Sequence, residues 1–245
     1  MNDTQPKKTG HLHPITQAIR EIYTIFSQLG FELASGPELE TEFYNFDALN
    51  VPKDHPARDM QDTFWIDSEA ARTLDDNGKS MRRVLRTHTS PGQIRYMETH
   101  KPPFRMIIPG KVFRNEATDA THEAQFYQVE GLVVDKHISL AHLKATLEKF
   151  FKLYLGPDVE IRFRPSFFPF VEPGVEVDIR WKDKWLEVMG AGLVHPNVFK
   201  AAGFDADVWQ GFAFGGGIDR LVMLKYGTDD VRQFYSGDLR FVNQF

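Results

Sequence analysis

The sequence predicts an α+β fold in which an antiparallel β-sheet is flanked by helices. Strand-like runs follow one another through most of the chain and are joined by short turns, whereas parallel strands need long crossover connections. Helical patterns occur near the two ends and in one long insertion, so helices do not alternate regularly with strands. There is no internal repeat. We therefore expect one domain, residues 13–245, after a polar tail, residues 1–12, that is expected to be disordered.

The composition is that of a soluble globular protein. Of the 245 residues, 42% are hydrophobic, which is enough to close a substantial core. The net charge of −5 excludes the basic balance of a self-sufficient nucleic-acid binder. Cysteine is absent, which excludes disulfides, thiolate metal sites and a cysteine nucleophile. No apolar run approaches the roughly 18 residues that span a bilayer, so we expect a cytoplasmic protein without membrane contact.

The first expected element is an amphipathic helix that begins near Pro14. Its apolar residues recur at helical spacing, and Gly30 is placed to end it. They are Ile15, Ile19, Ile22, Phe26 and Leu29. The next stretch, GFELASGPELE, predicts a short strand broken at Gly36-Pro37, and the proline-rich PKDHPARDM predicts a loop.

Two hairpins and a second helix are expected next. DTFWID and MRRVLRTHTS flank Asn77-Gly78, which is a strong signal for a tight hairpin turn. FRMIIPGKVFRN and QFYQVEGLVVD flank a longer polar loop. The helix is SLAHLKATLEKFFKLYLG, with Ser139 as its N-cap and Gly156 at its end.

The C-terminal part predicts more strands and a last helix. VEIRFRPS, VEVDIRW and KWLEVMGAGLV are strand-like runs, and GFAFGGGIDRLVMLKYG predicts a strand that leads into a helix ended by Gly227. The glycine-rich run lacks the lysine of a phosphate-binding P-loop. It leaves the backbone open to a ligand, with Arg220 in the first turn of the following helix.

One predicted strand carries polar residues where a core is expected. In QFYQVEGL, one face combines Phe126, Gln128, Glu130 and Leu132. A buried carboxylate costs several kcal/mol unless it is paired. This face is therefore either solvated or the floor of a cleft, and both interpretations stay open for Glu130.

Two more polar groups stand beside predicted strands. Arg114 and Glu116 are expected on one face of the preceding strand, with His122 across the loop. They suit an anionic ligand, because guanidinium binds phosphate bidentately, or else they form a surface ion pair. The stretch THTSPGQ holds His88 and Ser90 in what could be an ordinary turn. It lacks the G-x-S-x-G elbow of a serine hydrolase, and no H-E-x-x-H or Cys/His pattern indicates zinc.

Taken together, these segments resemble the class II aminoacyl-tRNA synthetases, and most closely the α (catalytic) subunits of bacterial phenylalanyl-tRNA synthetases. Three class II signatures appear in order: GFELASGPELE with Pro37, VFRNE with Arg114, and GFAFGGGIDR with Arg220. Stretches similar to those specific for this subunit are LRTHTSPGQIR, THEAQFYQVEG, IRFRPSFFPFVEPGVEVD, WLEVMGAGLVHPNV and DLRFVNQF. The resemblance runs from about residue 13 to the end.

The resemblance implies a class II synthetase fold whose sheet is the floor of the active site, so the polar face of the hairpin would bind ligands. The implied reaction joins L-phenylalanine to ATP and transfers the phenylalanyl group to tRNA(Phe), with Mg²⁺ as a cofactor. The implied catalytic residues are Arg114 on the α-phosphate, Glu116, which would contact the nucleotide or the substrate ammonium, His122 near pyrophosphate, and Arg220. The implied ATP-binding residues are Arg114, Phe126 and Arg220, the last two on either side of adenine. The implied phenylalanine-binding residues are His88, Ser90, Gln128, Glu130, Phe168, Phe170, Val171 and Ala213, and the implied magnesium ligand is Glu172.

The resemblance also implies partners and shows departures. It implies a β subunit in an α2β2 assembly, or a self-dimer through the first helix and the GPELE segment. Relatives carry a helical N-terminal arm that contacts tRNA, so we expect a truncated, engineered or naturally short form. Asp219 and Ala191 replace the glutamate and cysteine that are common in relatives. Two alternatives are kept: a non-catalytic paralogue with this fold, and a ligase that loads a different acceptor.

Overall fold

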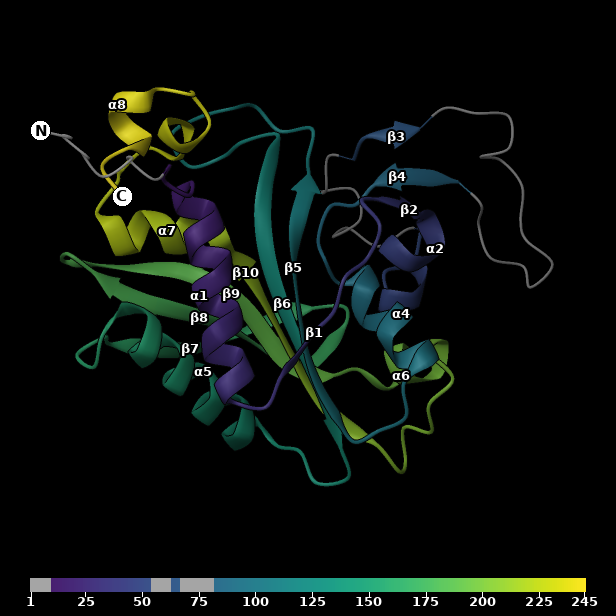
Figure 1. The fold of residues 1–245 in the computed structure, drawn as a ribbon. Helices are drawn as coiled ribbons and strands as arrows, with labels where there is room; N and C mark the ends of the chain where they lie inside the picture. Colours follow the sequence, from purple (N-terminus) through teal and green to yellow (C-terminus); the bar gives the residue numbers. More distant parts are fainter. Residues whose placement is uncertain (1–9, 54–62, 67–81) are drawn as a thin grey trace, which may run out of the picture.

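The computed structural model describes residues 10–53, 63–66 and 82–245. It confirms the predicted α+β class. The main sheet has seven strands in the order β1-β5-β6-β10-β9-β8-β7, and a small sheet, β2-β4-β3, lies beside it (Figure 1). The strands are β1 (Glu32–Leu33), β2 (Leu39–Thr41), β3 (Trp65–Ile66), β4 (Arg83–Leu85), β5 (Phe104–Phe113), β6 (Gln125–Asp135), β7 (Ile161–Phe168), β8 (Val171–Trp181), β9 (Lys184–Val194) and β10 (Gln210–Gly217). The helices are α1 (Pro14–Gln28), α2 (Glu42–Asn45), η1 (Asp47–Leu49), α4 (Pro91–Thr99), α5 (Leu140–Leu155), α6 (Pro196–Ala201), α7 (Ile218–Tyr226), η3 (Val231–Phe234) and α8 (Leu239–Val242).

The strand pairing follows the prediction with one exception. β5 and β6 form the expected long hairpin, β7, β8 and β9 form an antiparallel meander, and β10 lies between β6 and β9. The exception is β1, which runs parallel to β5, with Glu32 opposite Met106. The sheet is therefore mixed. About seventy residues separate these two strands in the sequence, so no tight turn dictates an antiparallel direction.

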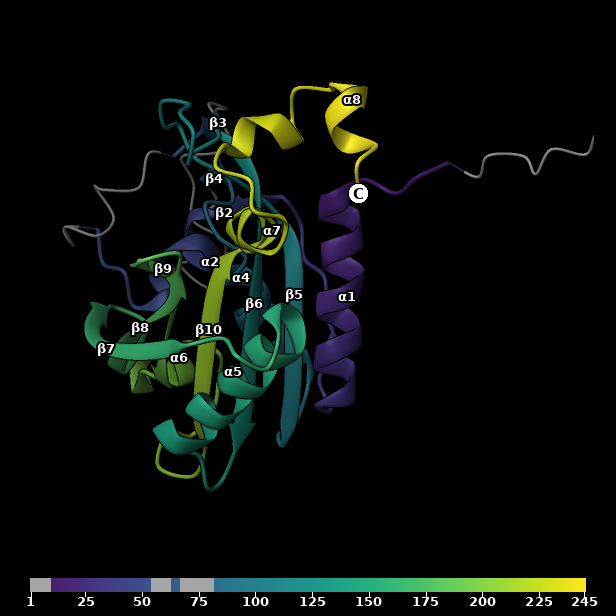
Figure 2. The same ribbon diagram turned by 90° about the vertical axis from the view of Figure 1, so that its left-hand side faces the viewer.

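The alternation of side chains along the central strands builds two cores, one on each face of the sheet. Val129 and Val133 of β6, with Phe214 of β10, pack in the core under α1, α5 and α7. Leu132 of β6 and Ala213 of β10 pack in the core under η1, α4 and α6. Figure 2 shows α1 standing on one side of β5 and β6. Glu130 shares the face of Leu132, so the polar stripe of β6 points away from α1 and α5.

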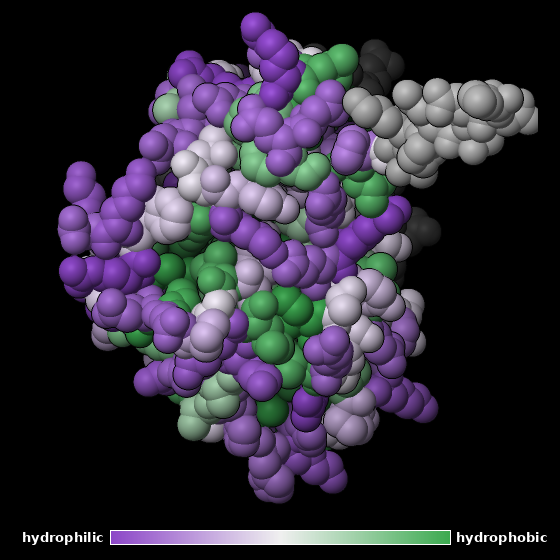
Figure 3. All heavy atoms as spheres, turned by 60° about the vertical axis from the view of Figure 1, so that its left-hand side comes forward, coloured by the Kyte–Doolittle hydropathy of each residue, from purple (hydrophilic) through white to green (hydrophobic). Residues whose placement is uncertain are grey.

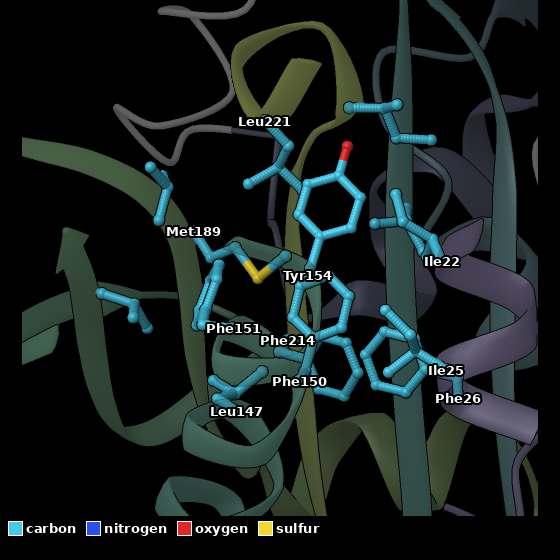
Figure 4. Close-up of a cluster of buried hydrophobic side chains, with 14 of the residues drawn as sticks. Ile22, Ile25, Phe26, Leu147, Phe150, Phe151, Tyr154, Met189, Phe214 and Leu221 are labelled. Atoms are coloured by element: carbon cyan, nitrogen blue, oxygen red, sulfur yellow. The ribbon is translucent and has the colours of Figure 1, made fainter. Parts of the chain in front are cut away.

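Stacked aromatic rings hold α1 and α5 to the sheet. The ring of Phe26 lies 4.6 Å from that of Phe150 and 5.3 Å from that of Phe214, both nearly parallel. Figure 4 shows these three rings converging from α1, α5 and β10. All three are completely or almost completely buried, so this stack is the centre of the first core.

The predicted helices are confirmed, but the described residues also form helices that were not predicted, of which α4 is the longest. α1, α5 and α7 cover the expected stretches, and Gly30 and Gly227 follow two of them in the left-handed conformation. The stretch that begins at Pro91 was interpreted as a turn but forms α4, whose first residue is a proline suited to a helix start. The predicted turn at Asn77-Gly78 lies outside the described residues, although β3 and β4 on either side of it pair antiparallel.

Polar side chains predominate on the face of the molecule that Figure 3 shows, and hydrophobic ones gather in recesses near the centre. None of the helices in the described ranges is long and apolar enough to cross a membrane.

Replacing Phe26 with alanine should strongly destabilise the fold. The change empties the centre of the ring stack, and phenylalanine-to-alanine changes in cores cost about 3–5 kcal/mol. Urea denaturation of both proteins would measure the difference. Tyr23→Ala, at an exposed position of the same helix, is the control and should cost less than about 1 kcal/mol. Equal losses in the two variants would contradict this account of the core.

Candidate active site

A cavity of about 510 Å³ opens on the face of the sheet that carries Glu130. Its walls come from β6, β9, β10, the turn between β7 and β8, and the start of α4. Most of the residues singled out in the sequence line it: His88, Ser90, Arg114, Phe126, Gln128, Glu130, Phe168, Phe170, Val171, Ala213 and Arg220. Segments that are far apart in the sequence therefore meet in one site.

Glu130 is the buried acid of this site, with only 5% of its surface exposed. The Thr89 N–H donates to Oε1 at 3.1 Å, and the Gln93 amide donates to Oε2 at 2.6 Å. Burial raises the pKa of Glu130, while hydrogen bonds from Ser90, Gln93 and Thr89 act in the opposite direction. The solvated interpretation is wrong: Glu130 is part of the floor of the cleft. Its hydrogen-bond donors are all neutral, although the charges of Arg86 and Arg114 also act on it, and a cationic ligand group would add to this pairing.

The backbone of β10 makes room for this carboxylate. Gly215 lies opposite Glu130 in the β6–β10 ladder. A Cβ atom at Gly215 would lie 2.6 Å from Cγ of Glu130. The absence of a side chain in the glycine-rich run is thus a packing requirement of the buried acid.

His88 lines the same cavity as a neutral side chain. Burial, and then the charge of Arg114, lower the pKa of His88 to about 3. Among the described residues, His88 Nδ1 and Gln128 Oε1 are buried polar atoms without a hydrogen-bond partner. Such atoms are costly unless a ligand satisfies them. They therefore indicate the polar end of a binding site.

Arg114 forms the cationic part of the cavity. Its Nε donates to the Thr87 carbonyl at 3.1 Å, and its guanidinium lies 5.2 Å from the centre of the Phe126 ring. The predicted position on the strand is wrong, since β5 ends at Phe113 and both Arg114 and Glu116 follow it. Arg114 still continues the pairing, because its N–H donates to the Ala124 carbonyl. Its head group is only 3.8 Å from Glu116, so the ion pair and the anion site share this arginine.

Arg220 enters the cavity from α7, the helix that follows β10. It lies in the first turn of α7, and its Nη1 donates to the Glu187 carbonyl at 2.9 Å. Glu187 also lines the cavity. Burial, and then the neighbouring Glu176, raise the pKa of Glu187. Glu187 was not expected from the sequence, where it reads as one polar residue of a strand.

Asp219 is a second residue that sequence reasoning missed as part of the site. Its Oδ2 accepts the Tyr127 N–H at 2.7 Å, and its Oδ1 accepts a hydrogen bond from the Tyr235 hydroxyl. β10 ends opposite Gln128, so this side chain takes over the pairing of β6 where β10 stops. Burial raises the pKa of Asp219 to about 6. The carboxyl-to-amide bond fixes the strand between two cavity residues, Phe126 and Gln128.

An aromatic wall closes the other side of the cavity. The rings of Phe168 and Phe170 stack 5.9 Å apart at 18°. Phe168 lies directly over Gly190, where a Cβ atom would be 2.8 Å from the ring. Ala213 of β10, opposite Gly192 of β9, also lines the cavity. The site thus joins a flat apolar slot to a buried acid.

Three predicted residues do not line the cavity. Glu116 faces Arg114, His122 is exposed with its Nδ1 3.0 Å from Asp119, and Glu172 is exposed with an oxygen 3.4 Å from His195. No group of three or more His, Cys, Asp or Glu side chains able to hold a metal occurs in the described ranges. The metal position expected at Glu172 therefore stays a prediction.

Comparisons with known proteins define the class. The family model described as "tRNA synthetases class II core domain (F)" matches residues 2–245, so the chain belongs to the class II tRNA synthetase core family, as its sequence predicted. The chain is 52% identical over 253 residues to the phenylalanine–tRNA ligase alpha subunit of Dehalococcoides mccartyi, covering 98% of this chain and 71% of that protein. It is 51% identical over 250 residues to that of Zymomonas mobilis, covering 96% and 68%. The crystal structure of pyrrolysyl-tRNA synthetase from Desulfitobacterium hafniense has the same fold, with a TM-score of 0.71 at 17% identity over 97% of this chain and 78% of that one.

Gly215→Ala should destabilise the protein by about 1–3 kcal/mol, the usual cost of overpacking. The added methyl group collides with Glu130, which is held by its donors and cannot move away. Urea denaturation measures the change. Gly10→Ala is the control, because a Cβ atom there meets nothing within 4 Å. A neutral effect of Gly215→Ala would show that Glu130 can leave its place.

Asp219 should make stability depend on pH. Its pKa rises from 3.8 in the unfolded chain to about 6 in the folded one, so the folded state binds the proton more tightly. The stability from this group is complete below pH 3.8 and is lost as the pH rises through about 6. Between pH 4 and 7, unfolding free energies of the native protein relative to Asp219→Asn should therefore fall by roughly 2 kcal/mol.

Tyr235→Phe also tests the raised pKa of Asp219, because it should raise that pKa further. The tyrosine hydroxyl stabilises the charged carboxylate and lowers the pKa of Asp219. Without it, the loss of stability should move to higher pH. A pH-independent difference between the native protein and Asp219→Asn would refute the assignment.

Proposed function

We propose that the chain activates L-phenylalanine with ATP, giving phenylalanyl-adenylate and pyrophosphate, and then transfers the phenylalanyl group to tRNA(Phe). One observation carries this: the buried acid Glu130 lies opposite Gly215, which lies opposite Gly190, on which Phe168 of the aromatic wall rests. The acid suits the ammonium of an amino acid and the wall suits its aromatic ring. The curated relatives at about 50% identity are phenylalanine–tRNA ligase alpha subunits.

The proposed activation step is an in-line exchange at the α-phosphorus of ATP. A carboxylate oxygen of phenylalanine forms the new bond to phosphorus, and the bond to pyrophosphate breaks. Glu130, His88, Ser90 and Gln128 would hold the amino acid at its polar end. Positioning by these groups supplies much of the rate, because the reacting atoms are already close and aligned.

Charge stabilisation would come from the two arginines of the cavity. Arg114 would bind the α-phosphate, where negative charge increases during the exchange. Phe126 would stack on adenine, with Arg220 on its other face. In the second step, a ribose hydroxyl of the terminal adenosine attacks the activated carbonyl carbon, and AMP leaves.

Magnesium and the outlying residues fit this scheme to different degrees. Mg²⁺ that enters with ATP needs only one or two carboxylates besides phosphate oxygens, and Glu187 offers one in the cavity. There the ion would neutralise phosphate charge. His122 shares its loop with Thr121 and Glu123, which line the cavity, and we propose that departing pyrophosphate passes it. Glu116 would act through Arg114, and Glu172 is proposed as a separate surface ligand for magnesium.

We also propose a β subunit or a second copy of the chain as partner. The expected contact surface, α1 and the GPELE segment, includes Leu39, which is 39% exposed. Buried Arg86 connects this segment to the site, donating to the carbonyls of Gly36 and Lys111. We also propose a cytoplasmic location, and the proposed role in protein synthesis is its only support.

Arg114→Ala should reduce phenylalanine-dependent ATP–pyrophosphate exchange by about 100-fold or more, the usual loss when a group that stabilises transition-state charge is removed. Arg114→Lys should recover only part of it, since lysine cannot bind phosphate bidentately. Arg105→Ala, an exposed arginine of β5, is the matched control and should retain activity.

The same assay separates the alternatives. Exchange with phenylalanine, but not with tyrosine, supports the proposal, and charging of tRNA(Phe) excludes a ligase with a different acceptor. Absence of exchange, both alone and with a β subunit, would favour a non-catalytic paralogue.

A further inference from the structure

Two asparagines hold the turn between β7 and β8, which carries Phe168 and Phe170 of the aromatic wall. Asn50 Nδ2 donates to the Pro169 carbonyl at 2.6 Å. Asn197 Nδ2 in turn donates to Asn50 Oδ1 at 2.9 Å. Pro169 stands between Phe168 and Phe170, so this chain of amides ends on the peptide that links the two rings of the wall.

The backbone places Asn50 for this contact. It ends η1 in the left-handed conformation, with φ 60° and ψ 28°. Asparagine tolerates this conformation better than most residues. The next residue, Val51, lines the cavity. η1 contacts α6, which carries Asn197, so two elements outside the sheet hold the turn.

The turn is fixed on its other sides as well. The His195 N–H donates to the Phe170 carbonyl at 3.0 Å, next to the carbonyl that Asn50 binds. On the cavity side, Phe168 rests on Gly190. The turn is therefore fixed at the Pro169 carbonyl, at the Phe170 carbonyl and at the Phe168 ring, and Asn50 is the side chain that holds the first of these.

We propose that Asn50 is a positioning residue that sets the distance between the aromatic wall and the buried Glu130, and so contributes to selection of the amino-acid side chain. Asn197 orients the Asn50 amide. This inference rests on the proposed activation of phenylalanine. In the described part of the chain, the Asn50 side chain bonds the Pro169 carbonyl and Asn197, so we expect its effect at the aromatic end and not at the nucleotide.

Asn50→Gly is the sharpest test, because glycine adopts the same backbone conformation without strain. In ATP–pyrophosphate exchange, the KM for phenylalanine should rise about tenfold, the scale of one lost hydrogen bond. The KM for ATP should stay within about twofold, and the preference for phenylalanine over tyrosine should fall. Asn197→Ala should act in the same direction but more weakly, and should add nothing to Asn50→Gly, because the two amides act in series.

The matched control is Asn243→Gly, at an exposed position at the end of α8, which should leave both KM values unchanged. Equal rises in the KM for phenylalanine and for ATP would overturn the proposal, because they would indicate general loosening. An unchanged KM for phenylalanine would overturn it as well.

Hydrogen exchange separates this proposal from the proposed function. In Asn50→Gly, the His195 amide should exchange faster, because the Phe170 carbonyl that it binds is less well fixed, while the Val133 amide in the sheet should not change. Suppose that the native protein shows no ATP–pyrophosphate exchange, but the His195 amide still exchanges hydrogen faster in Asn50→Gly. The proposed function would then fail, and the role of Asn50 in holding the turn would stand. If the protein is active but the His195 amide exchanges hydrogen at the same rate in Asn50→Gly, only the role proposed for Asn50 would be refuted.

Discussion

The burial of the Glu130 carboxylate in the face of a β-sheet is the constraint on which the rest of the site depends. A lone carboxylate in that position would cost several kcal/mol. The N-terminal end of α4 therefore has to supply the Thr89 amide and the Gln93 side chain, and β10 has to pass without a side chain at Gly215. The proximity of α4, β6 and β10 thus follows from the demands of one acid.

Much of this arrangement could be predicted from the sequence, because it depends on local patterns. Alternation in QFYQVEGL placed Gln128 and Glu130 on one face, and the helical periods of α1 and α5 located the first core. Alternation alone could not decide whether that face of the strand was solvent-exposed or buried. That depends on α4, whose start at Pro91 looks like a turn in the sequence.

Other features depend on contacts between distant segments and give no local signal. The parallel pairing of β1 with β5 is one of them, since nothing in a two-residue strand indicates its direction. Asp219 is another: it reads as a residue of a glycine-rich motif, and its role becomes visible only where β10 ends and Tyr127 needs a partner. Asn50 lies in a stretch that offers no periodic pattern, and its partner Asn197 is 147 residues away.

The three ends of the cavity have separate supports, and this separation has a physical consequence. The polar end depends on α4 and Gly215, the nucleotide end on Asp219, and the aromatic wall on Asn50. No hydrogen bond described above joins one support to another, although η1 and α4 pack in the same core. Changes at well-separated sites usually act additively. A change at one part of the site should therefore largely leave the geometry of the other parts intact. In this way one sheet can carry a nucleotide site and an amino-acid site that vary separately.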